Sequence, residues 1–255
     1  MNFSNKGFPM TNEGIESVCT TLGISAPKVW AVLTVETRGF GFLEDRRPQL
    51  LFERHIFHKL TAGKHDKGNN DISNAEPGGY IGGSDEYTRL AKAMQLDRNA
   101  ALQSASWGVG QVVGFNHKTV GFSTIDEMIT EMIKGENEQL LAMANFIKAN
   151  ELAGALQRRD WVAFARGYNG PGFSKFNYDQ RLAAAHAKYE VMLPDLILRS
   201  AQAALLYLGF KPGPVDGVIG RRTKSALAEF QEKLGLPDTG ELDSETEKKL
   251  LDEAF

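Results

Sequence analysis

Much of the chain is divided into segments of helical length that carry the start and stop signals of α-helices. Ser25 and Pro27 precede the apolar run of residues 28–36, and Gly39 lies just past the end of this run. Comparable patterns predict helices at residues 13–22, 84–95, 97–104, 124–134, 136–149, 160–166 and 179–192, with Ser84, Asp97 and Asp160 as N-caps. The chain from about residue 12 to residue 189 is therefore predicted to be mainly α-helical.

Two stretches interrupt this pattern. Residues 47–57 favour an extended segment followed by the start of a helix. Residues 63–83 are rich in Gly, Asn, Asp and Pro, which predicts a long loop. A loop of that length inside a compact domain is usually either functional or disordered.

A domain boundary is expected at Pro194. Beyond it, residues 196–208, 222–234 and 244–251 predict three helices, and residues 209–220 form a Gly- and Pro-rich turn region. Three helices in about 60 residues make a small but foldable bundle. We therefore expect two domains, residues 1–193 and 194–255, and no solenoid repeat across the chain.

Charge and cysteine content exclude several classes of protein. The net charge is −3, and residues 195–255 carry 8 basic and 11 acidic residues, so neither domain has the basic surface typical of nucleic-acid binding. The apolar runs are too short to span a bilayer, and the N-terminus lacks the apolar region of a signal peptide. Cys19 is the only cysteine, which precludes an internal disulfide and fits a reducing cytoplasm. We expect a soluble protein that binds neither nucleic acid nor membrane.

Metal and cysteine chemistry are not expected. His55 and His58 lie three residues apart, and His65 and Asp66 follow in the long loop, but no His-Glu-x-x-His motif or second cysteine accompanies them. Cys19 falls in the predicted helix 13–22 and is expected to pack in the core. No cofactor or metal is implied.

Glu36 is the first candidate for chemistry. It stands in the last turn of the predicted helix 28–36, where the negative end of the helix disfavours a carboxylate. Apolar neighbours such as Val32 and Leu33 add desolvation in the same direction, so we expect a raised pKa for Glu36. A general acid in glycoside cleavage needs this property. Taken alone, a glutamate at this position is more often simply a solvated residue at a helix end.

Two further segments contain glycines and polar side chains suited to a sugar-binding groove. The segment from Ser106 to Phe115 contains three glycines, one tryptophan and Gln111, whose side-chain amide both donates and accepts hydrogen bonds. Tyr168 and Asn169 stand at the end of a predicted helix, directly before Gly170. The alternatives are a Gly-rich turn beside a buried Trp107, and an ordinary helix C-terminus with Gly as its stop signal.

These three motifs, in this order, resemble those of the lysozyme-like superfamily, which includes goose-type lysozymes and lytic transglycosylases. The matching residues are Glu36-Thr37, Gly108-Val109-Gly110-Gln111 and Gly167-Tyr168-Asn169. A closer resemblance, over about residues 10–190, is to the phage-type N-acetylmuramidases, through Val35–Phe42, Leu51–His55 and Ala105–His117. The resemblance implies a mostly helical lysozyme-like domain with Glu36 on one wall of a groove. It also implies that Ser106, Gln111, Tyr168 and Asn169 lie near that groove.

The chain departs from the superfamily pattern at Thr37, which replaces the usual Ser and keeps its hydroxyl. The pattern also leaves the second carboxylate open. Glu53, within the family-like Leu51–His55 block, ranks before Asp45, and Glu44 is more remote. The alternative for Glu53 is a structural ion pair, for example with an Arg. Carboxyls about 6.5–9.5 Å apart would indicate inversion at the anomeric carbon, and about 5–5.5 Å retention.

Residues 196–252 resemble the three-helix peptidoglycan-binding domain. Much of the pattern, such as Leu205 and Phe230, is explained by a helical core, and Asp216-Gly217 by turn chemistry. The candidate wall contacts are the residues around the loop that leads into the second helix, namely Asp216, Arg221 and Thr223.

The resemblance implies an endolysin that hydrolyses the β-1,4 bond between N-acetylmuramic acid and N-acetylglucosamine and so lyses its bacterial host. Bacterial peptidoglycan is the expected partner, and we expect a monomer. The protein would stay in the host cytoplasm until the membrane is permeabilised, and would then reach the periplasm or wall. Two alternatives are a lytic transglycosylase that forms 1,6-anhydromuramic products and a wall-binding protein without activity. A secreted antibacterial effector would use the same chemistry.

Overall fold

The computed structural model describes residues 3–36, 39–170 and 172–255, apart from the side chains of Glu36 and Lys175. Helices dominate these residues, which confirms the mainly α fold class. We call the residues up to Val191 the N-terminal domain and residues 196–255 the C-terminal domain. Helix α10 ends at Val191 and α11 begins at Leu196, on either side of Pro194.

The longer helices follow the predicted segments closely, whereas β2, β3 and α8 were not predicted. The N-terminal domain contains α1 (Asn12–Leu22), α2 (Ala26–Glu36), β1 (Leu50–Phe52), α3 (Arg54–Leu60), η1 (Gly83–Asp85), α4 (Glu86–Leu96), α5 (Arg98–Gln103), β2 (Ala105–Trp107), β3 (Val112–Val113), η2 (Gly114–Asn116), α6 (Ile125–Met132), α7 (Glu136–Ala149), α8 (Ala153–Gln157), α9 (Trp161–Asn169), η3 (Phe173–Phe176) and α10 (Tyr178–Val191). The C-terminal domain contains α11 (Leu196–Tyr207), α12 (Arg221–Lys233) and α13 (Ser244–Ala254).

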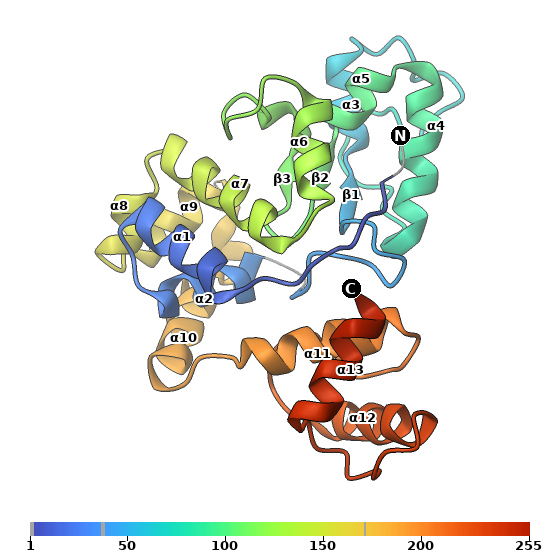
Figure 1. Cartoon of the computed structure of the whole chain (residues 1–255). Coiled ribbons are helices and arrows are strands. Elements are labelled where there is room, and N and C mark those ends of the chain that lie inside the picture. Colours follow the sequence, from blue (N-terminus) through green and yellow to red (C-terminus); the bar gives the residue numbers. More distant parts are fainter. Residues whose placement is uncertain (1–2, 37–38, 171) are drawn as a thin grey trace.

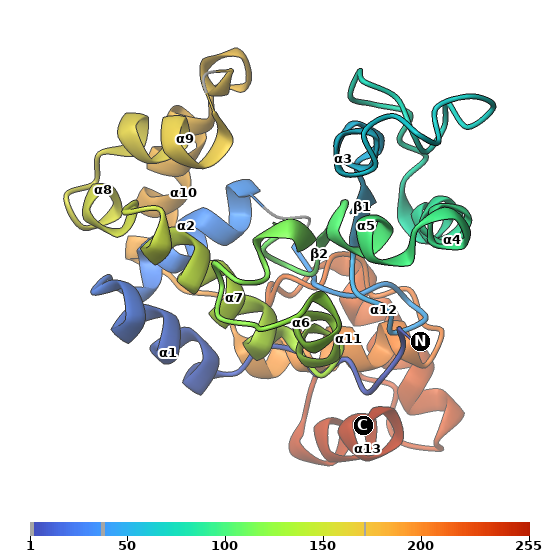
Figure 2. The same ribbon diagram turned by 90° about the horizontal axis from the view of Figure 1, so that it is seen from above.

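The N-terminal domain has two lobes on either side of α7 (Figures 1 and 2). One lobe is helical: α2 packs along α10, and α1 packs along α2 and α7. The other combines the small sheet with α3, α4 and α5, and α4 packs on β1. In Figure 1 the C-terminal domain lies below the N-terminal domain, and the chain enters it from the end of α10.

The helix ends follow the capping residues in the sequence. Asp97 and Asp160 accept hydrogen bonds from Ala100 N and Ala163 N, as predicted for N-caps. The prediction for Ser84 is wrong, because Ser84 lies inside the 3₁₀ turn η1 and Asp85 precedes α4 without a side-chain cap. Cys19 is partly buried against the main core.

The small sheet has the order β1-β2-β3, with both pairs antiparallel. Leu50 pairs with Trp107 and Phe52 with Ala105, and Ser106 pairs with Val113. The second motif, for which a Gly-rich turn beside a buried Trp was the alternative interpretation, forms the hairpin between β2 and β3. Trp107 is fully buried, and its indole N–H donates to Leu102 O.

The C-terminal domain is a three-helix bundle around a small core. Its buried apolar side chains are Ala201, Ala204, Leu205, Ala226, Leu227, Phe230, Leu250 and Ala254. Two buried glutamines close the loops between its helices. Gln202 accepts from Gly217 N at 2.8 Å, and Gln231 accepts from Gly240 N at 2.9 Å. Each of these amides also donates to a threonine at the start of the next helix, Thr223 or Thr246.

The two domains share an apolar cluster. Phe40 and Phe42 of the N-terminal domain pack with Ala203 and Val215 of the C-terminal domain. Among the described residues, no single helix is long and apolar enough to cross a membrane; α1 together with residues 26–35 reaches that length and composition only as a pair bent by 100°.

Candidate active site

Glu36 is the last residue of α2, at the position that the sequence predicts. Its side chain, with Thr37 and Arg38, lies outside the described residues, so its raised pKa stays a prediction. The helix that carries it is fixed firmly. Thr34 Oγ1 lies 2.8 Å from the Tyr189 hydroxyl of α10, and the Arg181 guanidinium reaches Val35 O at 3.5 Å. A cation at this position suits the partial negative charge of a helix C-terminus.

The segment that follows Glu36 is held by a buried carboxylate of α7. Gly41 N donates to Glu136 Oε1 at 2.8 Å, and Gly41 O accepts from Gln49 N at 2.8 Å. A Cβ on Gly41 would lie 2.1 Å from Gln139 Oε1. The glycine therefore allows this segment to approach α7 closely.

The same helix holds the Gly-rich loop of the second motif. Val109 N donates to Gln139 Oε1 at 2.6 Å, and a Cβ on Gly108 would lie 2.4 Å from Gln139 Cδ. Glu136 and Gln139 are both fully buried, one helical turn apart on α7. They connect the segment after Glu36 to the second motif, although neither stood out in the sequence.

Gln111 and Tyr168 line one pocket of about 110 Å³, so the second and third motifs meet in space. The Tyr168 hydroxyl donates to Gly110 O at 3.2 Å, and its ring stacks on Phe164. Gln111 has a φ of +47°, and its Nε2 donates to Gly108 O at 2.8 Å. A left-handed conformation is unfavourable for a residue with a side chain, so the loop around Gln111 is held there by its surroundings.

The other two residues of these motifs are placed differently. Asn169 is the last residue of α9, half-buried beside Tyr168. Ser106 lies in β2, the central strand of the sheet, with only 6% of its surface exposed. Its side chain therefore lies within the packed sheet rather than on the pocket that Gln111 and Tyr168 share. A substrate contact of either residue stays a prediction.

Glu53 follows β1 directly and precedes α3. Its side chain is 14% exposed, and its Oε2 accepts a hydrogen bond of 2.7 Å from the Tyr80 hydroxyl. Burial, with the hydrogen bond and charge of Glu53, raises the pKa of Tyr80 to about 12, so Tyr80 stays a donor. His55 Nδ1 lies 3.3 Å from the same oxygen. The partners of Glu53 are thus a tyrosine and a histidine, not the arginine that the ion-pair alternative suggested.

A buried ion pair fixes the strand end that carries Glu53. Glu86 accepts from Phe52 N, Ile81 N and Gly82 N, and Arg89 Nη1 donates to both Glu86 Oε2 and Phe52 O. Burial alone would raise the pKa of Glu86, but the three N–H groups and Arg89 outweigh it, and the pKa is lowered. The pair joins β1 to the end of the long loop.

Side chains of α3 and of the loop itself bond to several groups of the long loop. Arg54 donates to Asn70 O, Glu76 O and Pro77 O over 2.9–3.2 Å. His58 and Ser73 both bond to the Asp66 carboxylate, and these two hydrogen bonds lower the pKa of Asp66. Across the described ranges, no group of three or more His, Cys, Asp or Glu side chains is arranged to hold a metal ion.

Asp45, the second candidate for the partner carboxylate, is in an exposed turn. Its side chain is 47% exposed and forms a 2.6 Å ion pair with Arg47. The neighbouring Arg46 donates to Ala254 O, and Glu44 lies 3.3 Å from Lys211, so this turn faces the C-terminal domain. Glu53 and Asp45 both stay predictions as the second catalytic group.

The predicted wall contacts of the C-terminal domain differ in accessibility. Thr223 is 2% exposed and donates to Pro212 O, so its hydroxyl is used inside the domain. Asp216 accepts from Val218 N at 3.0 Å and closes the turn. Arg221 is exposed at the first position of α12. Burial thus speaks against a direct wall contact of Thr223, whereas Arg221 is accessible to a ligand.

Comparisons with known proteins identify the families of the two domains. The chain matches the N-acetylmuramidase family model over residues 25–190 and the putative peptidoglycan-binding domain model over residues 197–250. The crystal structure of the Burkholderia AP3 phage endolysin is similar, with 35% identity over 71% of this chain and 71% of that chain and a TM-score of 0.67. No protein with a curated description matches the chain. The chain belongs to the N-acetylmuramidase family, glycoside hydrolases that act on peptidoglycan, and carries a C-terminal domain of the peptidoglycan-binding type.

Proposed function

We propose that this peptidoglycan-degrading enzyme is a phage-type endolysin that hydrolyses the β-1,4 bond between N-acetylmuramic acid and N-acetylglucosamine. The observation that carries the proposal is the meeting of three motifs that are far apart in the sequence. The segment after Glu36 and the loop Gly108–Gln111 are both bonded to α7, and the Tyr168 hydroxyl bonds to Gly110 O within that loop. In this proposal, these contacts bring the acid Glu36 and the sugar-binding groups to one region.

In this proposal Glu36 donates its proton to the glycosidic oxygen as the bond breaks. General-acid catalysis of this kind contributes about 10²–10⁴-fold to the rate. Gln111 and Tyr168 hold a sugar unit at the pocket that they line, with Asn169 beside them. Glu53 is the preferred partner because Tyr80 fixes its carboxylate in one orientation, whereas the Asp45 carboxylate is paired with Arg47. The partner either activates a water molecule or stabilises the positive charge that develops on the sugar.

The C-terminal domain would keep the enzyme at its insoluble substrate. A binding module attached to an enzyme raises the local substrate concentration without adding a catalytic contact. Lysis of the bacterial host, after another agent has opened the membrane, belongs to this proposal. The similarity to the Burkholderia AP3 phage endolysin supports it.

The bond that is cleaved can be identified from the new sugar ends. Purified sacculi are digested, the new reducing ends are reduced with borohydride, and the reduced amino sugars are identified after acid hydrolysis. We expect reduced muramic acid, because cleavage after this sugar leaves it at the reducing end. Reduced glucosamine in its place would show that the enzyme cleaves the other glycosidic bond, and the proposed specificity would be wrong.

A further inference from the structure

A fully buried ion pair joins the two domains. Arg199 of α11 donates through Nη1 and Nη2 to both carboxylate oxygens of Glu136 on α7, and both side chains are 0% exposed. Such a pair adds little net stability over apolar residues of the same size, because burial of two charges is costly. The presence of this ion pair at the domain junction is therefore better explained by a role in addition to stability.

The contacts of this pair lead to the segment that follows Glu36. Arg199 Nη2 also donates to Gly39 O at 2.8 Å, and its guanidinium lies 5.4 Å from the centre of the Phe40 ring. Glu136 accepts from Gly41 N at 2.8 Å. Residues 39–41 are thus held from one side by the N-terminal domain and from the other by the C-terminal domain.

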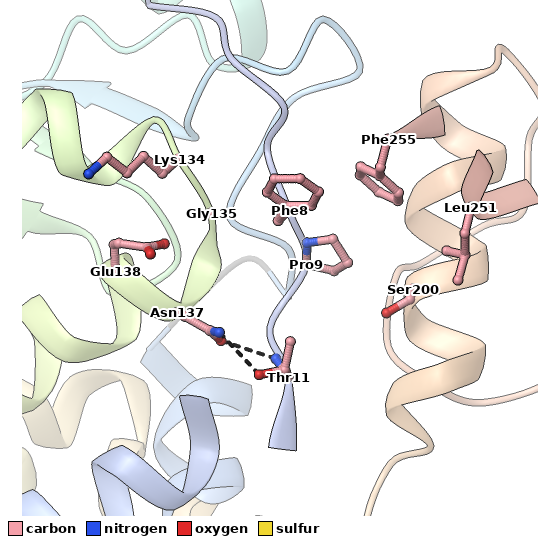
Figure 3. A pocket seen from close by; sticks show the side chains of 10 residues that line it. All are labelled: Phe8, Pro9, Thr11, Lys134, Gly135, Asn137, Glu138, Ser200, Leu251 and Phe255. Carbon is pink, nitrogen blue, oxygen red and sulfur yellow. Dashed lines mark hydrogen bonds between the residues drawn. The ribbon is translucent and has the colours of Figure 1, made fainter. Parts of the chain in front are cut away.

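The N-terminal segment enters the same junction. Met10 N donates to Glu136 Oε2 at 2.9 Å, and the Phe8 ring stacks on Phe255 at 5.4 Å. Figure 3 shows Phe8 and Pro9 between the start of α7 and the helices α11 and α13 of the C-terminal domain. Beside them is an apolar pocket of about 480 Å³. Glu136 therefore forms hydrogen bonds to the N-terminal segment, to residues 39–41 and to α11.

The planar guanidinium is required for this arrangement. It presents its N–H groups in a rigid fork, so it can pair with a carboxylate on two oxygens and reach a third acceptor at the same time. The ammonium of a lysine is a single charged centre on a flexible stem. A lysine in place of Arg199 would keep a positive charge for Glu136 but could not also hold Gly39 O in the same geometry.

We propose that Arg199 is a positioning residue: helix α11 of the C-terminal domain fixes residues 39–41 and, through them, the end of α2 that carries Glu36. The C-terminal domain then has a second role besides wall binding, because it completes the support of the catalytic acid. This inference rests on the proposed function, in which Glu36 is the acid. It concerns a different property of the molecule, the dependence of turnover on a residue outside the N-terminal domain.

The test compares Arg199→Lys with Tyr207→Phe in the full-length enzyme, on soluble peptidoglycan fragments. Tyr207→Phe is the matched control, because it removes another hydrogen bond between the domains, from the Tyr207 hydroxyl to Gly7 O. We expect Arg199→Lys to lower kcat by about 10–100-fold, the size of effect that a small misplacement of a catalytic group produces, with KM changed less than about two-fold. Tyr207→Phe should keep kcat within about two-fold.

Two further measurements separate positioning from folding and from wall binding. Thermal unfolding identifies a temperature at which every variant is folded, and kcat is measured there. Retention on sacculi, measured with Glu36→Gln added to each protein, should be the same with and without the Arg199→Lys substitution. If Arg199→Lys does not fold, Glu136→Gln/Arg199→Met takes its place, since this double variant leaves no buried charge unpaired.

Equal losses of kcat in Arg199→Lys and Tyr207→Phe would overturn the proposal, because a general loosening of the domains would then explain both. An unchanged kcat in the folded Arg199→Lys enzyme would overturn it as well. A parent enzyme without activity on peptidoglycan would contradict the proposed function instead, so the two failures are distinguishable.

Discussion

Replacing Glu36 by Gln is expected to lower the rate of peptidoglycan cleavage by about 10²–10⁴-fold, while the protein remains folded and bound to the wall. The amide has nearly the same shape as the protonated carboxyl, but it cannot donate a proton to the leaving oxygen. Initial rates on purified sacculi measure the effect. Retention on sacculi and thermal unfolding show that binding and folding are kept.

Glu190→Gln is the matched control for this substitution. Glu190 is in the last turn of α10, in the same lobe as α2, and its side chain is 45% exposed and paired with Arg159. The same chemical change there should leave the rate within about two-fold of the parent, since exposed pairs contribute little to stability. If Glu36→Gln cleaved sacculi as fast as Glu190→Gln, Glu36 would not be the acid.

The second large effect is expected on stability. Arg89→Leu removes the guanidinium that pairs with the buried Glu86, and should lower the free energy of unfolding at pH 7 by about 3 kcal/mol. This is the lower end of the usual range for breaking a buried pair, because three backbone N–H groups remain with the carboxylate. Urea unfolding curves of parent and variant give the difference.

The same pair predicts how this difference depends on pH. In the parent, the pKa of Glu86 is lowered in the folded state, so its ionised form contributes stability above the unfolded pKa of about 4.3. That contribution is lost as the pH falls through the lowered folded pKa. Removal of Arg89 raises the folded pKa of Glu86 again, so the gap between parent and variant should be largest near pH 7 and narrow below about pH 4.

Lys92→Leu is the control on the same helix. Lys92 forms an exposed ion pair with Asp71, and such pairs contribute about 0–1 kcal/mol. An Arg89→Leu variant that lost no more stability than Lys92→Leu would show that the Glu86–Arg89 pair does not hold β1 and the long loop as described.

The helices could be predicted because their signals are local. Asp97 and Asp160 cap the helices that they precede, and Gly23 ends α1 in a left-handed conformation. The strands β2 and β3 span only three and two residues, which is too short for an alternating pattern to be recognised. The helix α8 spans only five residues, which are too few to show the 3.6-residue period of a helix.

The candidate site could be predicted in part. The motifs located Gln111 and Tyr168, which share a pocket, whereas Ser106 lies within the sheet. The buried charges Glu136 and Arg199 did not stand out, because 63 residues separate them and a single sequence gives no sign that one requires the other. The sequence predicts an exposed Thr223, whereas contacts with Gln202 and Pro212, 21 and 11 residues away, bury its hydroxyl. The role of a polar residue whose partners lie far along the chain can be recognised only in the tertiary structure.

The central claim, hydrolysis with Glu36 as the acid, is tested most directly by mass spectrometry of digested sacculi in heavy-oxygen water. The account predicts that the parent enzyme produces N-acetylmuramic acid ends that carry the heavy oxygen, and that Glu36→Gln produces almost none. Ends in the 1,6-anhydro form without the heavy oxygen would contradict it, because the muramic 6-hydroxyl would then have attacked in place of water and the enzyme would be a lytic transglycosylase. Labelled ends in equal amounts from parent and Glu36→Gln would show that another group is the acid.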